Sequence, residues 1–222
     1  MLDAMIFDFD GVVVDSEPIH LVGFRAALAK RGIELSTEDY YSKYVGFDDH
    51  DCFATVLEDN GRRADEAEIA AMTAEKTAQI KKAFAESIQP LPGALELMRA
   101  VRAAGAGVAI CSGGLREEIE IAGRAVGALE LVDVLVSAED VSRGKPDPEG
   151  YKLALRLLGQ VRPSPPDPAA VYVVEDAPAG AAAAKAAGCK VIAVTNSYNR
   201  EALGLADVVV DSLTEISLED LA

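Results

Sequence analysis

Short apolar runs that alternate with helix-like segments constrain the fold of this chain most. Runs rich in β-branched residues lie at 4–9, 108–111, 133–136, 171–175, 191–194 and 208–210. Most intervals between the later runs carry helical patterns, at 93–104, 115–126, 148–159 and 178–187. Buried strands that alternate with helices are typical of a parallel sheet with helices on both faces. The pattern therefore predicts an α/β fold.

One long interval departs from this alternation. Between residues 17 and 90 no strand is evident, and helices are expected near 18–31, 37–45, 49–60 and 65–86. The simplest organisation is an all-helical insert of residues 16–90 within an α/β unit of residues 1–15 and 91–222. Further along, the segment 159–170 contains four prolines and predicts an exposed loop.

The amino-acid composition limits the classes of binding partner and the cellular compartment that we expect for this protein. A formal net charge of -16, from 37 acidic and 21 basic residues, repels nucleic acid and anionic membranes. Any phosphate site must therefore reverse the sign locally with a metal, a lysine or backbone N–H groups. The 3 cysteines are widely spaced and indicate reduced thiols in the cytoplasm. The first residues lack the features of a signal peptide, and no stretch is apolar enough to span a membrane.

Polar residues gather where the predicted strands end. In an open parallel sheet, ligands bind beyond the carboxyl ends of the strands, so these residues are expected to lie together. They are Asp8, Asp10, Ser112, Gly113, Gly114, Lys145, Glu175 and Asp176. Taken singly, each has an ordinary structural explanation, because Asp-Gly and Gly-Gly pairs mark turns and acids favour helix starts. Their conjunction predicts one shared active site.

These residue types suit phosphoryl transfer. Carboxylates such as Asp8 and Asp176 are ligands that Mg²⁺ prefers. Asp8 could attack phosphorus to form an aspartyl-phosphate, and Asp10 could protonate the leaving oxygen and later activate water. Charge on the phosphoryl oxygens would be held by Ser112, Lys145 and backbone N–H groups. The N–H donors in this prediction are those of Gly113 and Gly114.

Four segments resemble the motifs of the haloacid dehalogenase-like superfamily: "DFDGVVVDSE", "CSGG", "GKPDPEGY" and "VVEDAPAGAAAAKAAG". The match is closest to the helical-cap branch that includes β-phosphoglucomutase and phosphoglycolate phosphatase. The resemblance implies a Rossmann-like core and a helical cap that closes over the site. It implies Asp8 as nucleophile, Asp10 as general acid/base, and Ser112 and Lys145 as phosphate ligands. It also implies Mg²⁺ held by Asp8, Asp10 and Asp176, with Glu175 close by.

Two features of the resemblance bear on the reaction. Members that cleave carbon–halogen bonds lack an aspartate at position 10, so Asp10 favours phosphate esters. The β-phosphoglucomutase pattern has an arginine where this chain has Asp49, and an acid there would repel a second phosphate. His20 and Lys82 match cap residues of that enzyme and are candidate substrate ligands. His20 could equally be a packed or surface histidine, and Lys82 could belong to an exposed helix face.

The leading hypothesis is a Mg²⁺-dependent phosphatase that acts on a small phosphorylated metabolite through an aspartyl-phosphate. A sugar phosphomutase with the same first half-reaction is the nearest alternative. A phospho-accepting signalling module is a third, but it needs neither Asp10 nor the helical insert. A monomer or weak dimer is expected, with no nucleic acid or membrane partner.

Overall fold

The chain divides into an α/β unit and a helical unit. In the computed structural model, Met1–Asp15 and Gln89–Ala222 form the α/β unit, and Ser16–Ile88 form the helical unit. The structure describes residues 2–45, 47, 49–63 and 65–221, and the side chains of Lys82 and Asp220 lie outside the described part. Asp48, which precedes Asp49 in the sequence, also lies outside the described residues.

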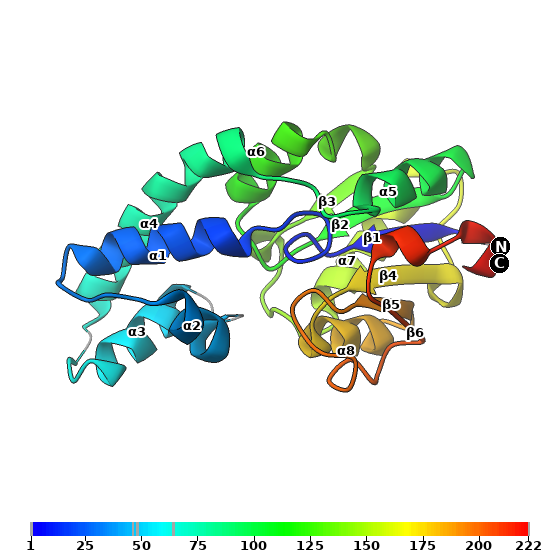
Figure 1. Cartoon of the computed structure of the whole chain (residues 1–222). Helices are drawn as coiled ribbons and strands as arrows, with labels where there is room; N and C mark the ends of the chain where they lie inside the picture. The colour runs from blue at the N-terminus through cyan, green and yellow to red at the C-terminus, as the bar shows by residue number, and fades with distance from the viewer. Residues whose placement is uncertain (1, 46, 48, 64, 222) are drawn as a thin grey trace. The chain divides into compact units, whose positions relative to one another are not determined.

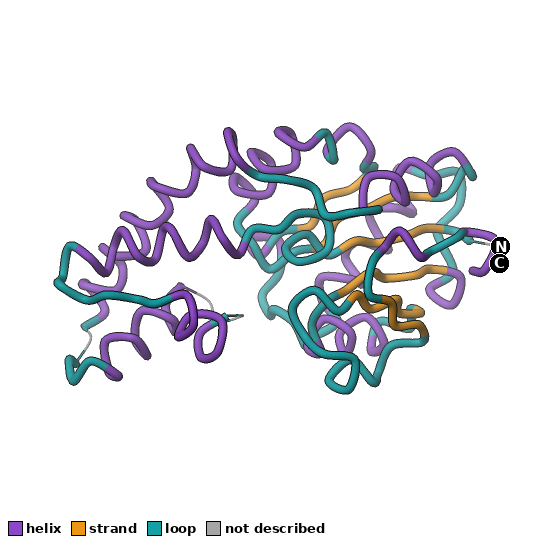
Figure 2. Tube along the Cα trace, viewed as in Figure 1, coloured by secondary structure: helices purple, strands orange, loops and turns teal. Residues whose placement is uncertain are grey.

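A parallel sheet forms the centre of the α/β unit (Figure 2). Within the described residues it has six strands in the order β3-β2-β1-β4-β5-β6, with every neighbouring pair parallel. The strands are β1 (Ala4–Phe7), β2 (Gly107–Cys111), β3 (Val134–Val136), β4 (Val171–Glu175), β5 (Lys190–Val194) and β6 (Val208–Val210). The predicted α/β class with a parallel sheet is confirmed, and the apolar runs are buried because both faces of the sheet are covered.

Helices connect the strands from β1 to β5, whereas turns connect β5 to β6 (Figure 1). α5 (Ala94–Ala103) packs against β1 and β2, whereas α7 (Glu149–Val161) and α8 (Pro178–Ala186) contact each other and bury side chains from β1, β2 and β4 in one core cluster. α6 (Arg116–Val126) connects β2 to β3. Along the chain, the strands are added on one side of β1 as far as β3 and then on its other side as far as β6. Right-handed crossovers therefore put α5 and α6 on one face of the sheet and α7 and α8 on the other.

β1 ends earlier than the sequence pattern suggests. The apolar run predicts a strand over 4–9, but the strand ends at Phe7. Asp8 extends the pairing by one bond, from its N–H to the carbonyl of Val174 at 2.9 Å. The chain then turns, because the carbonyl of Phe9 accepts hydrogen bonds from the N–H groups of Val13 and Val14 at 2.8 and 3.1 Å. Asp8 and Asp10 are therefore brought to the sheet edge by a turn and not by strand alternation.

The helical unit is built from four α-helices among its described residues: α1 (Glu17–Ala29), α2 (Thr37–Asp39), α3 (Asp49–Asp59) and α4 (Glu66–Ser87). A π-helical turn, Tyr40–Tyr44, follows α2. Their common core includes Phe24, Phe53 and Met72. Lys76 of α4 is also buried: its ammonium pairs with Asp49 and lies 4.2 Å from the ring centroid of Phe24.

The predicted exposed loop at 159–170 is shorter than expected. α7 continues to Val161, and Pro168–Ala170 form a 3-10 turn, so the irregular stretch covers only 162–167. Across the described residues, no helix combines the length and the apolar character that a membrane span requires.

Candidate active site

A tight turn after β1 carries the first two candidate residues. Gly11 has φ +74°, a conformation that side-chain-bearing residues rarely adopt. A Cβ atom on Gly11 would lie 1.9 Å from Asp176 Oδ2, so the turn also needs a residue without a side chain. The loops after β1 and β4 therefore approach each other closely, as the positions of the polar residues in the sequence predict.

Asp8 lies in a buried ionic cluster. The Lys145 ammonium is 2.7 Å from Asp8 Oδ1 and 2.7 Å from Glu175 Oε1. Glu175 is fully buried and accepts further hydrogen bonds, from the Tyr151 hydroxyl at Oε1 and from the Asp176 N–H at Oε2. Lys145 is thus shared by the carboxylates of Asp8 and Glu175, and Tyr151 donates a hydrogen bond to Glu175, the more deeply buried of the two.

Asp176 is supported by the loop after β5, a segment that contains none of the four motifs. The Ser197 hydroxyl donates a hydrogen bond to Asp176 Oδ2. The neighbouring Asn196 side chain donates to the carbonyl oxygen of Gly11 at 2.7 Å. Both residues follow β5, and together they connect the turn after β1 with the loop after β4. Neither Asn196 nor Ser197 belongs to the site predicted from the sequence.

Asp10 lies beside the second motif. The Ser112 hydroxyl is 3.4 Å from Asp10 Oδ2, and the Gly114 N–H donates to Ser112 Oγ at 2.9 Å. A Cβ atom on Gly114 would lie 3.5 Å from Asp10 Oδ2, so this loop passes close to the turn after β1. The structure therefore brings Asp10, Ser112 and Gly114 together, and Gly113 lies between the last two.

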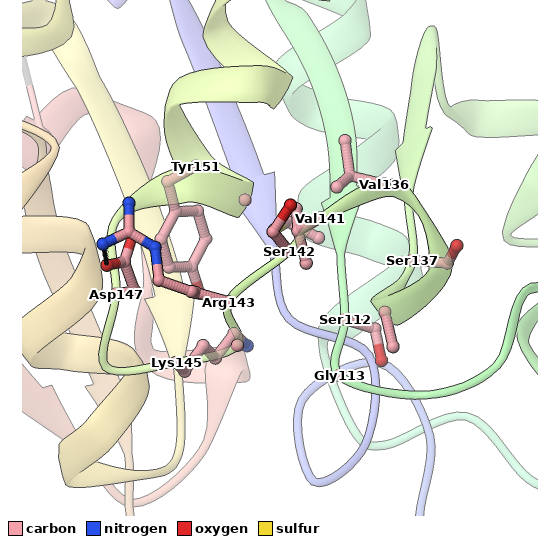
Figure 3. Close-up of a pocket in the computed structure, with 14 residues that line it drawn as sticks. Ser112, Gly113, Val136, Ser137, Val141, Ser142, Arg143, Lys145, Asp147 and Tyr151 are labelled. Carbon is pink, nitrogen blue, oxygen red and sulfur yellow. Dashed lines mark ion pairs between the residues drawn. The ribbon is translucent and has the colours of Figure 1, made fainter.

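A cavity of about 200 Å³ opens next to these groups (Figure 3). Ser112, Gly113 and Lys145 contribute to its wall, as does the ring of Tyr151. Lys145 and Tyr151 come from the loop before α7 and from α7 itself, so the third motif supplies one side of the cavity.

Burial and like charges perturb the acids strongly. Burial raises the pKa of Asp8 well above its usual value, Lys145 opposes this effect, and Glu175 and Asp176 add to it. Burial likewise raises the pKa of Asp176 to about 7, although the Ser197 hydrogen bond acts in the opposite direction. For Lys145, burial would lower the pKa, but the attraction of Asp8 and Glu175 outweighs burial and raises it well above the usual value. Lys145 therefore stays charged.

The carboxylates of this site fit a hard divalent cation. Asp8, Glu175 and Asp176 each offer an oxygen within 4.8 Å of the others, and all three residues are buried. The donors are oxygens only, which is the ligand chemistry of Mg²⁺. A lone lysine cannot balance this cluster, as the raised pKa values of Asp8 and Asp176 indicate. A divalent cation would supply the missing charge.

The two predicted substrate ligands of the insert belong to the helical unit. His20 lies on α1, with its ring 5.6 Å from that of Phe84 in an edge-to-face arrangement. Lys82 lies on α4, and its side chain is outside the described part of the chain. Their roles in substrate binding stay predictions.

Comparison with known proteins places the chain among hydrolases. The model of the haloacid dehalogenase-like hydrolase family matches residues 2–188. The chain is 33% identical over 217 residues to validoxylamine A 7'-phosphate phosphatase from Streptomyces hygroscopicus subsp. limoneus, covering 97% of this chain and 96% of that protein. It is 34% identical over 213 residues to hexitol phosphatase A from Escherichia coli K12, covering 96% and 92%.

Solved structures extend the similarity to the whole fold. The crystal structure of CbbY from Rhodobacter sphaeroides in complex with phosphate matches with a TM-score of 0.83 and 27% identity. The match covers 97% of this chain and 96% of that one, so it includes the helical insert as well as the sheet.

Proposed function

The chain belongs to the haloacid dehalogenase-like hydrolase family and is a phosphoric monoester hydrolase, and we propose that it releases phosphate from a small sugar or sugar-alcohol phosphate. The observation that carries the mechanism is the shared contact of Lys145 with Asp8 and Glu175 at the edge of a buried acid cluster. The substrate class rests on the names of the two relatives, which are phosphatases of hexitol and validoxylamine phosphates.

We propose that Asp8 is the nucleophile and Asp10 the general acid/base. An Asp8 oxygen forms a bond to phosphorus while the bond to the ester oxygen breaks, and Asp10 gives its proton to that oxygen. In the second step Asp10 takes a proton from water, the water oxygen bonds to phosphorus, and the bond to Asp8 breaks. The contact between Ser112 and Asp10 supports this role, because it keeps Asp10 beside the loop that would hold the phosphoryl group.

Phosphoryl oxygens would be held by Ser112, the Gly113 N–H and Lys145. The Gly114 N–H donates to Ser112 Oγ, so we assign it the orientation of that hydroxyl. Preorganised donors of this kind contribute about 3 kcal/mol each in sites that stabilise developing negative charge. The overall negative charge of the protein makes these local donors necessary.

We propose Mg²⁺ as the cofactor, held by the Asp8 and Asp176 carboxylates and the carbonyl of Asp10. When bound, it would neutralise the acid cluster and draw charge from the phosphoryl oxygens. Glu175 lies close by, but its oxygens already accept from Lys145, Tyr151 and backbone N–H groups. We therefore assign Glu175 to the support of Lys145.

The phosphomutase alternative is less well supported. A mutase needs a cation in the helical unit to hold a second phosphate. Lys76 is a buried lysine of that unit and is therefore a candidate for this role. Asp49, which replaces the arginine of the mutase pattern, already pairs with that lysine. The two phosphatase relatives also favour hydrolysis. The signalling alternative is set aside because these relatives turn over their phosphate esters.

Phosphate release from a panel of sugar, sugar-alcohol and other small phosphate esters tests the proposal. We expect the protein to release phosphate from one class of these esters, and to do so only when Mg²⁺ is present. Asp8→Asn should abolish release. Asp15→Asn, which changes an exposed acid at the end of the first motif, should release phosphate normally. Isomer formation from hexose 1-phosphates, dependent on a bisphosphate primer, would instead establish the mutase. Absence of release from every ester with Mg²⁺ would contradict the proposal.

A further inference from the structure

Tyr151 is a fully buried polar residue at the edge of the active site. It lies on the first turn of α7, only 1% of its surface is exposed, and its ring forms part of the cavity wall (Figure 3). Its hydroxyl donates a hydrogen bond to Glu175 Oε1. The same Glu175 oxygen contacts the Lys145 ammonium at 2.7 Å, so the tyrosine and the lysine share one acceptor.

The tyrosine also contacts the lysine directly. The Lys145 ammonium lies 5.4 Å from the centroid of the Tyr151 ring, within the range of a cation–π interaction. Lys145 is thus surrounded by three groups: Asp8 on the substrate side, Glu175 on the buried side, and the aromatic ring. Only Asp8 among these three would change its charge during the reaction, when its oxygen bonds to phosphorus.

The hydroxyl of Tyr151 limits how strongly Glu175 holds the lysine. A carboxylate oxygen that accepts a hydrogen bond from a second donor presents less negative charge to the first. Without the tyrosine proton, Oε1 would interact with Lys145 alone, and the ammonium would be drawn toward Glu175 and away from Asp8. The buried, low-dielectric setting makes this competition strong.

We propose that Tyr151 is a positioning residue, which acts through Glu175 to keep the Lys145 ammonium poised against Asp8 and the phosphoryl oxygens. This inference rests on the proposed phosphatase function and goes beyond it, because the Tyr151 hydroxyl contacts Glu175 and is assigned no contact with the reacting atoms. It assigns to Tyr151, the last residue of the third motif and part of α7, the positioning of the lysine that the same motif supplies.

Tyr151→Phe removes only the hydroxyl. Tyr172→Phe is a matched control, because Tyr172 is also buried in this unit, its hydroxyl contacts the Leu221 carbonyl, and a lysine, Lys190, lies 5.0 Å from its ring centroid. Tyr172 is on β4 three residues before Glu175, at the other end of the strand. Both substitutions remove one buried tyrosine hydroxyl and keep the ring, but the Tyr172 hydroxyl contacts the Leu221 carbonyl and the Lys190 ammonium instead of Glu175.

Two measurements with Mg²⁺ present test the inference: steady-state turnover of the best substrate, and calorimetric binding of inorganic phosphate. In Tyr151→Phe we expect kcat to fall between about 10- and 100-fold, because the misplaced cation acts on the transition state, and KM to rise by no more than the phosphate affinity falls. We also expect weaker phosphate binding, by about tenfold. Tyr172→Phe should leave both unchanged.

A double-variant cycle with Glu175→Gln completes the test. If Tyr151 acts through Glu175, the losses from the two substitutions will be less than additive. Equal kcat and phosphate affinity in Tyr151→Phe and the wild type would overturn the inference, whatever happens to the melting temperature. A wild-type protein that binds phosphate but turns over no ester would overturn the proposed function instead, and phosphate binding would still decide the role of Tyr151.

Discussion

At the scale of single residues, the least expected contact is that of Ser197 with Asp176. An outer hydrogen-bond partner fixes the orientation of a metal ligand, and its loss costs about 10- to 100-fold in metal affinity. We predict a loss of this size in Mg²⁺ affinity for Ser197→Ala, measured by calorimetry. Ser164→Ala, in the exposed stretch after α7, should bind Mg²⁺ normally. Equal affinities in Ser197→Ala and the wild type would mean that Asp176 needs no support.

The raised pKa of Asp176 predicts a specific pH dependence of stability without metal. The folded protein keeps a proton on Asp176 up to about pH 7, whereas the unfolded chain loses it near 3.8. The folded state therefore binds more protons between these values, and its stability falls as pH rises through this window, by at most about 1.4 kcal/mol per pH unit. The difference in unfolding free energy between wild type and Asp176→Asn in EDTA, from pH 5 to 8, measures this effect. A difference that stays constant, or that favours the wild type at high pH, would contradict it.

Several site residues were predictable because they follow strands. Asp8, Ser112, Lys145 and Asp176 lie after the carboxyl ends of β1 to β4, and their chemistry is recognisable from type and order. Ser197 was not predictable in this way. Its surroundings "TNSYNR" read as an ordinary polar loop, and only the tertiary approach of this loop to Asp176 gives the hydroxyl a partner.

At the scale of elements, α8 approaches Glu175 at a glycine. A Cβ atom on Gly180 would lie 1.8 Å from Glu175 Oε1. Helix propensity alone predicts that Gly180→Ala stabilises the protein by about 1 kcal/mol. We predict the reverse: a lower free energy of unfolding and a loss of activity, because the methyl group displaces Glu175 and with it Lys145. Denaturant unfolding and turnover measure both effects.

Ala182→Gly in the same helix is the control for this prediction. It should lower stability by about 1 kcal/mol through propensity alone and leave kcat unchanged. Gain of stability and full activity in Gly180→Ala would show that α8 can move away from Glu175 at no cost.

The Lys76–Asp49 pair predicts coupling between α3 and α4. The Lys76 side chain is only 3% exposed, and Asp49 is 28% exposed. Removing one partner of a buried ion pair costs about 3–5 kcal/mol, because the other charge stays buried and uncompensated. We predict a loss toward the lower end of this range for Asp49→Ala, since the pair is partly accessible to water. Lys76→Met with Asp49→Ala should recover most of it in urea unfolding, and strictly additive losses would contradict this coupling.

The sequence contains a signal for the burial of Lys76. Lys76 is in phase with Ile69, Met72 and Ile80, the apolar stripe of α4. A charged residue on such a stripe is buried, so it needs a partner. The identity of that partner depends on how α3 packs against α4, and helix periodicity carries no information about this. The positions of most helices and strands, in contrast, follow from local periodicity.

At the scale of the whole molecule, this strongly acidic protein places a positive side chain at the site where a phosphate group would bind. The net charge is -16, yet the candidate phosphate site combines an ammonium with backbone and hydroxyl donors at one edge of the sheet. The α/β class and its parallel sheet follow from the alternation of strands and helices. The order β3-β2-β1-β4-β5-β6 does not, because several parallel orders satisfy the same pattern of buried strands.

In the proposed mechanism Asp8 carries the phosphoryl group covalently, and Asp10 helps both to form and to hydrolyse this phosphoryl-Asp8. Asp10→Asn, given nitrophenyl phosphate, tests it directly, because this leaving group departs without a proton while hydrolysis still needs the base. After rapid acid quenching and peptide mapping, we predict phosphate on Asp8 in Asp10→Asn and none in Asp8→Asn. Phosphate on another residue, or none in Asp10→Asn during continued turnover, would contradict this mechanism.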